Sequence, residues 1–142
     1  MLRFLARTLL GGTVMYLSGL FLWERYYAVE RFLPPQFVDN QLASEVSRDL
    51  AIVWADIAGA LVLAVLLTMV ISWQDRSSVV DGLKTGAMVG IMIWGGVDLA
   101  LYANFEFFST AALITDPVIE SLKFAAAGAA MGLVGRDPEP RD

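Results

Sequence analysis

Four long apolar stretches, separated by short polar segments, dominate the pattern along the chain. Each stretch reaches the ~20 residues that a helix needs to cross about 30 Å of hydrocarbon. The apolar residues follow one another without the alternation of a barrel strand, so helices are the membrane-spanning structure that fits. We predict an all-α, membrane-spanning four-helix bundle in a single domain, residues 1–142, with helices at about 4–26, 50–73, 80–103 and 110–134.

The polar segments between the helices differ in kind. Residues 27–49 form the one sizeable extramembrane segment, and within it residues 38–49 could form a short amphipathic surface helix. Residues 135–142 form a polar tail, which we expect to fray as chain ends commonly do.

The first apolar stretch could be read as a signal peptide, because Arg3 and Arg7 precede it. It is longer than the 7–15 apolar residues of a signal sequence, and no small-residue cleavage site follows. Residues 23–27 are typical of an interfacial anchor, with aromatic rings at headgroup level. We therefore interpret the stretch as a retained helix.

The distribution of Lys and Arg predicts the orientation. With the N-terminus inside, the cytoplasmic face carries Arg3, Arg7, Arg76, Lys84, Arg136 and Arg141, and the outer face carries Arg25, Arg31 and Arg48. The excess on the inner face agrees with the positive-inside rule. We expect both termini in the cytoplasm and residues 27–49 outside it.

The composition is typical of a membrane protein and argues against several kinds of partner and chemistry. Apolar residues make up 57% of the 142 residues and charged residues 18%. This apolar fraction is larger than that of a typical soluble domain, and a chain this short has too little interior to hide it from water. A net charge of −5 argues against a nucleic-acid partner. The chain has no Cys and no His, the residues most used for thiol chemistry, metal binding and general-base catalysis, and it carries no familiar enzyme motif. We predict no enzymatic activity and no cofactor.

Small residues recur at four-residue spacing in three of the predicted helices. Gly82, Gly86 and Gly90 form one such stripe, and Gly128 and Gly132 form another. Ala51, Ala55 and Gly59 form a third. Such stripes let helix backbones approach closely. They predict packing within the chain or, alternatively, the interface of a homo-oligomer.

Ionisable residues lie inside three of the predicted spans. The candidate polar network or ion site comprises Asp56, Asp98, Tyr102, Asp116, Glu120 and Lys123, with Arg25 at the outer end of the first helix. The spacing of Asp116, Glu120 and Lys123 places them on one helix face, and Asp98 shares a face with Trp94 and Tyr102. A lone charge at the bilayer centre costs about 2.5–3.5 kcal/mol, so we expect these groups to converge in the outer half of the bundle. Two interpretations stay open: a structural network that fixes helix register, or a site for a proton, a cation or a polar ligand.

Pro117 leaves the start of the last helix open. Thr115-Asp116-Pro117 could begin a helix, because Pro is favoured in a first turn after a capping residue. The alternative is a proline kink inside a longer helix. We favour the kink, because residues 110–114 are apolar and continuous with the apolar run after Pro117.

The second half of the chain carries Lys84-Thr85-Gly86, Gly90, Asp98-Leu99, Tyr102-Ala103-Asn104, Thr115-Asp116, Ala127-Gly128 and Gly132. In these residues it resembles a group of small, uncharacterised bacterial membrane proteins with four helices. The chain departs from that group at Thr115, where Val is expected, and by having Pro117, Glu120 and Lys123. The resemblance covers residues 83–135 and implies a multi-pass protein of the bacterial cytoplasmic membrane. It implies no activity.

Two functions are consistent with this sequence. The first is a non-catalytic structural or accessory subunit, in which glycine stripes and aromatic edges contact lipid and either other membrane subunits or further copies of the chain. The second is a small proton- or cation-coupled transporter or channel that uses the acidic layer.

Overall fold

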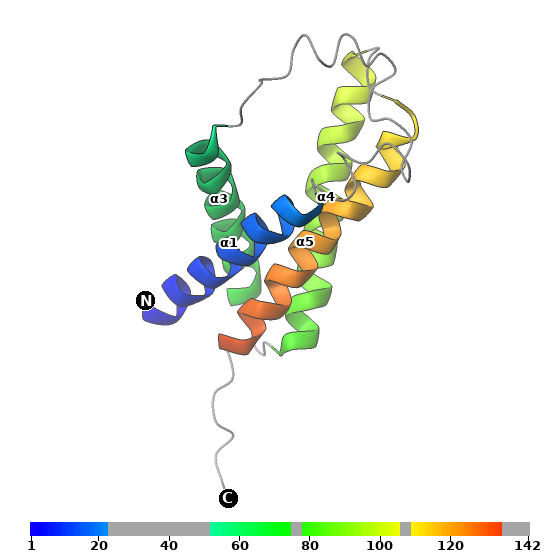
Figure 1. Ribbon diagram of the computed structural model, residues 1–142. Coiled ribbons are helices and arrows are strands. Elements are labelled where there is room, and N and C mark those ends of the chain that lie inside the picture. Colours follow the sequence, from blue (N-terminus) through cyan, green and yellow to red (C-terminus); the bar gives the residue numbers. More distant parts are fainter. Residues whose placement is uncertain (23–51, 75–77, 106–108, 135–142) are drawn as a thin grey trace, which may run out of the picture.

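The computed structural model describes residues 1–22, 52–74, 78–105 and 109–134. These residues form the helices α1 (Leu2–Leu22), α3 (Val53–Ser72), α4 (Val79–Asn104) and α5 (Ala112–Val134) (Figure 1). All of them are long and apolar enough to cross a membrane, and no strand occurs in the described ranges. The predicted all-α four-helix membrane fold is therefore confirmed. Residues 23–26, the segment at 27–49, the adjoining residues 50–51 and the tail at 135–142 lie outside the described residues.

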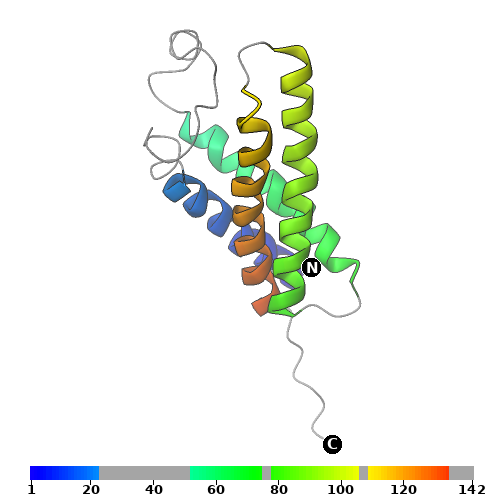
Figure 2. The ribbon, with the colours of Figure 1, turned by 90° about the vertical axis from the view of Figure 1, so that its right-hand side faces the viewer.

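Helix α5 is the centre of the bundle. It lies antiparallel against α4 along most of its length, and α1 crosses it obliquely (Figures 1 and 2). Within the apolar span of each helix, 56% of the α5 residues are buried, against 22% in each of the other three. Figure 1 shows α3 close to α4 near its C-terminal end and far from it at its N-terminal end.

Hydrogen bonds from serine side chains mark where α4 and α5 begin. Ser78 Oγ accepts from the backbone N–H of Asp81 at 3.1 Å, and the backbone N–H of Ser78 donates to Asp81 Oδ2 at 3.2 Å. This reciprocal capping satisfies two donors that would otherwise lack partners in the first turn. Ser109 Oγ likewise accepts from the backbone N–H of Ala112 at 3.0 Å. Helix α5 therefore begins before Pro117, which lies inside it, so the interpretation in which Pro117 starts the helix is wrong.

The glycine stripes of α4 and α5 bring the two backbones into contact. A Cβ atom placed on Gly82 would overlap the carbonyl of Gly128, and one on Gly86 would overlap the carbonyl of Phe124. Gly90 faces Ser121 and Phe124 in the same way, and Gly132 faces the backbone of Ser78. Because backbone atoms cannot rotate aside as side chains can, no larger residue fits at these positions without separating the helices.

Helix α1 joins α3 and α5 through smaller contacts. Thr8 Oγ1 donates to Thr68 Oγ1 at 3.1 Å, and Thr68 Oγ1 lies 3.7 Å from the sulfur of Met131. Gly11 of α1 faces the side chain of Met131 of α5, which lies against the position that a Cβ on Gly11 would occupy. The core around this junction consists of Met15, Ala64, Leu67, Ile71, Val89, Phe124, Ala127 and Met131.

One predicted stripe does not pack. Gly59 of α3 has no atom within 4 Å of an added Cβ, and its residue surface is exposed. The divergence of α3 from α4 agrees with this, because the N-terminal half of α3 lies away from α4 (Figure 1). The expectation of close packing is therefore wrong for Gly59, whereas Ala55 is half-buried and Ala51 lies outside the described residues.

Candidate functional site

Three acidic side chains are buried where α4 meets α5. Asp98 is 1% exposed, Asp116 7% and Glu120 6%. The carboxyl group of Asp98 lies within hydrogen-bonding range of Asp116 and close to Glu120. The antiparallel pairing of the helices brings them together, because Asp98 lies near the end of α4 and Asp116 near the start of α5. We call Asp98, Asp116 and Glu120 the acid cluster.

Glu120 connects the acid cluster to a cation. Its carboxylate forms an ion pair of 2.5 Å with the ammonium group of Lys123, one helical turn further along α5. The same ammonium nitrogen lies 5.9 Å from the centroid of the Trp94 ring of α4, within the range of a cation–π contact. The side chain of Lys123 is 20% exposed, so the pair lies at the edge of the buried region.

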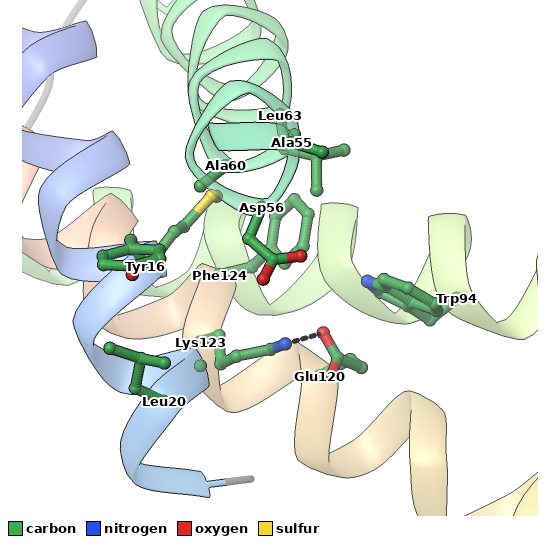
Figure 3. A pocket seen from close by; sticks show the side chains of 13 residues that line it. Tyr16, Leu20, Ala55, Asp56, Ala60, Leu63, Trp94, Glu120, Lys123 and Phe124 are labelled. Atoms are coloured by element: carbon green, nitrogen blue, oxygen red, sulfur yellow. Dashed lines mark ion pairs between the residues drawn. The ribbon is translucent and has the colours of Figure 1, made fainter. Parts of the chain in front are cut away.

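A pocket opens on the other side of this ion pair. Its volume is about 540 Å³, and residues of all four described helices line it. Figure 3 shows Asp56 of α3 pointing toward the Glu120–Lys123 pair, with Trp94 to one side and Tyr16 to the other. The remaining lining residues are Met15, Gly19, Leu20, Ala55, Gly59, Ala60, Leu63 and Phe124.

Most of the α3 residues that line the pocket lie in the N-terminal half of that helix, where α3 separates from α4 (Figure 1). Phe124 lines the pocket on the side of the buried core (Figure 3). Asp56 lies in the first turn of α3. It forms no hydrogen bond or ion pair with another described residue. The expected convergence of all the acids in one network is therefore only partial: Asp56 faces the pocket and does not join the acid cluster.

Two further candidates do not enter the site. Tyr102 is 44% exposed, and its hydroxyl oxygen lies 3.3 Å from Thr110 Oγ1 near the C-terminal end of α4. Its inclusion in the polar network is wrong, because α4 rotates its buried face away from Tyr102 toward the end of the helix. Arg25 lies outside the described residues.

Two buried polar atoms in this region have neither a hydrogen-bond partner nor an ion pair within the described ranges. They are Asp98 Oδ2 in the acid cluster and the indole nitrogen of Trp94 beside the pocket. Buried polar groups in native proteins are nearly always paired, so such atoms mark places where a proton, a water molecule or a ligand fits. No group of three or more acidic residues in the described part of the chain is arranged to hold a metal ion.

The pocket itself could not be found from the sequence. Trp94 offered a partial signal, because it precedes Asp98 by one turn on the same face of α4. The sequence carries no such signal for Tyr16, Leu20 and Phe124, because their contacts depend on how α1 crosses α5. Asp56 was identified from the sequence as a candidate site residue, but the prediction that it joins Asp98 and Asp116 was wrong.

The arrangement combines a shielded carboxyl pair with an accessible pocket that holds both charge and aromatic surface. It can take up a proton at the acid cluster, and it can accept a polar group at the pocket. Glu120 belongs to both, so the two parts are electrostatically linked. Neither a protein-family model, nor a curated protein, nor a solved structure matches this chain.

Proposed function

We propose that this integral membrane protein is a non-catalytic accessory subunit that works in assembly, either with another membrane protein or with further copies of itself. The observation that supports this most directly is an unfilled small-residue surface on α4. Gly96, Ala100 and Ala103 lie together on an exposed face of the outer half of the helix, and no atom lies within 4 Å of a Cβ added to Gly96.

The chain itself indicates what such a surface can do. In the inner half of α4, Gly82, Gly86 and Gly90 accommodate the backbone of α5. In the outer half the buried face of the helix turns toward Asp98, and the second stripe lies exposed on the opposite side, with none of the described helices packed against it. In a bilayer, apolar faces gain little from leaving lipid, so close packing at small residues is a main cause of helix association. The α4 stripe is suited to a helix from a neighbouring chain.

Replacing both Gly96 and Ala100 by leucine is expected to dissociate this assembly without unfolding the chain. The added side chains have room in the chain itself, and they block close approach by a second helix. Mass measurement after mild extraction should show wild-type protein above the 15.5 kDa of one chain and the double variant at that mass plus bound detergent.

Gly95→Leu is the matched control, because Gly95 also has no neighbour within 4 Å but lies off the stripe. It should keep the wild-type mass. Wild-type protein that runs as a single chain in native lipid would contradict the proposal.

A proton site is the second candidate function, and one specific observation favours it. Asp98 and Asp116 bring two carboxyl groups together in a buried place, and Asp98 Oδ2 has no partner among the described residues. Two carboxylates this close repel each other unless they share a proton. The scarcity of oxygen ligands around them suits a proton better than a metal ion. Proton uptake by liposomes containing the protein is the measurement that tests this function.

For the orientation, we propose that both termini face the cytoplasm of a bacterial cell and that the 27–49 segment lies outside the cytoplasmic membrane. The support is the Lys and Arg distribution together with the alternating direction of the helices, which places the start of α1 and the end of α5 toward the same side (Figure 1). Reporter fusions after residue 142 should be active only in the cytoplasm, and fusions at residue 40 only outside it. A cytoplasmic signal at residue 40 would reverse the assignment.

A further inference from the structure

We propose that the pocket lined by α1, α3, α4 and α5 is a binding site for an organic cation, an ammonium or phosphonium group that carries an apolar body. This goes beyond the assembly role and does not depend on it, because the pocket is lined by one chain and the α4 stripe lies on another face. Size, charge and aromatic surface each support the assignment.

The size of the pocket suits a small amphiphilic molecule. Its volume of about 540 Å³ falls within the range of about 300–1,000 Å³ typical of ligand sites. Most of the wall is apolar, with Met15, Leu20, Leu63 and Phe124 around it. The charged side chains of Asp56, Glu120 and Lys123 point toward one another (Figure 3), so a ligand would place its charged end among them and its apolar body against the rest of the wall.

The charges of the pocket favour a cation. Glu120 and Lys123 neutralise each other as an ion pair, whereas Asp56 has no partner among the described residues. Figure 3 shows the Asp56 carboxylate directed across the pocket toward that pair. An anion would meet two carboxylates and one ammonium group that is already paired. A cation placed between Asp56 and Glu120 instead gains attraction from both in a region of low dielectric constant.

Aromatic rings complete the site. Trp94 and Tyr16 flank the charged groups and Phe124 lies behind Asp56, so a cation in the pocket has ring faces within reach (Figure 3). The position of the Lys123 ammonium, 5.9 Å from the Trp94 centroid, shows that this ring can attract a cation in the pocket. Carboxylate and ring faces together are the surroundings in which proteins recognise ammonium groups. A bare metal ion would find too few oxygen ligands, since no three acidic side chains among the described residues are placed to hold one together.

The test compares two ions of the same shape and opposite charge, tetraphenylphosphonium and tetraphenylborate, in lipid nanodiscs that contain the full chain. Binding is measured by equilibrium dialysis, with protein-free nanodiscs as the baseline. The phosphonium ion should bind saturably and the borate ion should not. Asp56→Asn should weaken phosphonium binding at least about tenfold, and Asp56→Glu, which keeps the charge, should restore most of it.

Two tryptophan variants examine the aromatic contribution. Trp94→Leu should weaken binding about three- to thirtyfold, in line with the loss of one cation–π contact. Trp54→Leu is the matched control, because Trp54 is 73% exposed on α3 and does not line the pocket. It should leave binding unchanged. Thermal unfolding of each variant confirms that a loss of binding is not a loss of fold.

Changing the lipid of the nanodisc distinguishes between two sources of the natural cation, a lipid headgroup and a soluble molecule. If the natural occupant is a lipid headgroup, phosphatidylethanolamine in the nanodisc should compete with the phosphonium ion, whereas phosphatidylglycerol alone should not. If the natural occupant is a soluble cation, the two lipids should give the same affinity. Equal binding of the borate ion, or phosphonium binding that is unchanged in folded Asp56→Asn, would overturn the proposal.

Discussion

Gly86→Leu is expected to prevent α4 and α5 from packing and to remove most of the folded protein. A Cβ at Gly86 overlaps the backbone carbonyl of Phe124, and the two helices must separate to admit even an alanine. Overpacking a core costs roughly 1–3 kcal/mol when side chains can adjust, and more when backbone must move. Because this contact runs through the central helix of the bundle, we expect a loss of at least about 3 kcal/mol. Thermal unfolding in mild detergent, together with the yield of monodisperse protein, measures it.

Gly95→Leu again provides the comparison on the same helix. Leucine forms helix more readily than glycine by close to 1 kcal/mol, and no atom lies within 4 Å of the added Cβ. Its melting temperature should equal or exceed that of the wild type. If Gly86→Leu melts at the same temperature as Gly95→Leu, the backbone contact between α4 and α5 is not formed in the protein.

Lys123→Met is expected to be the second most damaging change. Methionine preserves much of the volume but removes the partner of Glu120, which is 6% exposed and close to Asp98. Removing one member of a buried pair typically costs 3–5 kcal/mol, and the partial exposure of Lys123 places our expectation near the lower end, about 3 kcal/mol. Adding Glu120→Gln should recover a large part of this loss, since both charges are then absent. Independent, additive losses in a double-mutant cycle would show that the pair is not coupled.

The substitution Asp98→Asn distinguishes between two interpretations of the acid cluster, a structural network and a proton site. Asparagine has nearly the same shape and can still donate a hydrogen bond to Asp116, so the fold should survive in either case. If the acid cluster carries protons, Asp98→Asn should abolish the proton uptake of liposomes that contain the protein. It should also remove the infrared signal of a protonated carboxyl group. If wild type and variant take up protons at the same rate, the cluster serves only to hold α4 against α5.

The parts of this structure that depend on short-range sequence spacing were predictable. The spans follow from runs of apolar residues. The common face of Asp116, Glu120 and Lys123 follows from helical periodicity. The small residues that face each other across α4 and α5 were visible as four-residue repeats, because close antiparallel helices require such repeats.

The parts that depend on how helices tilt were not predictable. Gly59 belongs to a stripe of the same kind as Gly86, yet nothing packs on it, because α3 diverges from α4. Tyr102 shares a face with Asp98 in an ideal straight helix, but the buried side of α4 turns away before reaching it. The contact of Gly11 with α5 was not predicted either, because Gly11 belongs to none of the four-residue repeats of small residues identified in the sequence.

The close pairing of α4 and α5 also bears on how the chain enters the bilayer. Taken alone, α5 is a poor candidate for insertion, with a mean hydropathy of 1.3 against 2.2 for α3 and with two acids and a lysine along its middle. Asp116 and Glu120 of α5 meet Asp98 of α4, and Gly82, Gly86 and Gly90 of α4 are in turn covered by α5. A short connection at residues 105–111 joins the two. The unit that the insertion machinery has to release into lipid is therefore the α4–α5 hairpin. A chain that ended at Phe105 would leave Asp98 of α4 without the helix that covers it, so we expect α4 to be held in the membrane only after α5 has followed it.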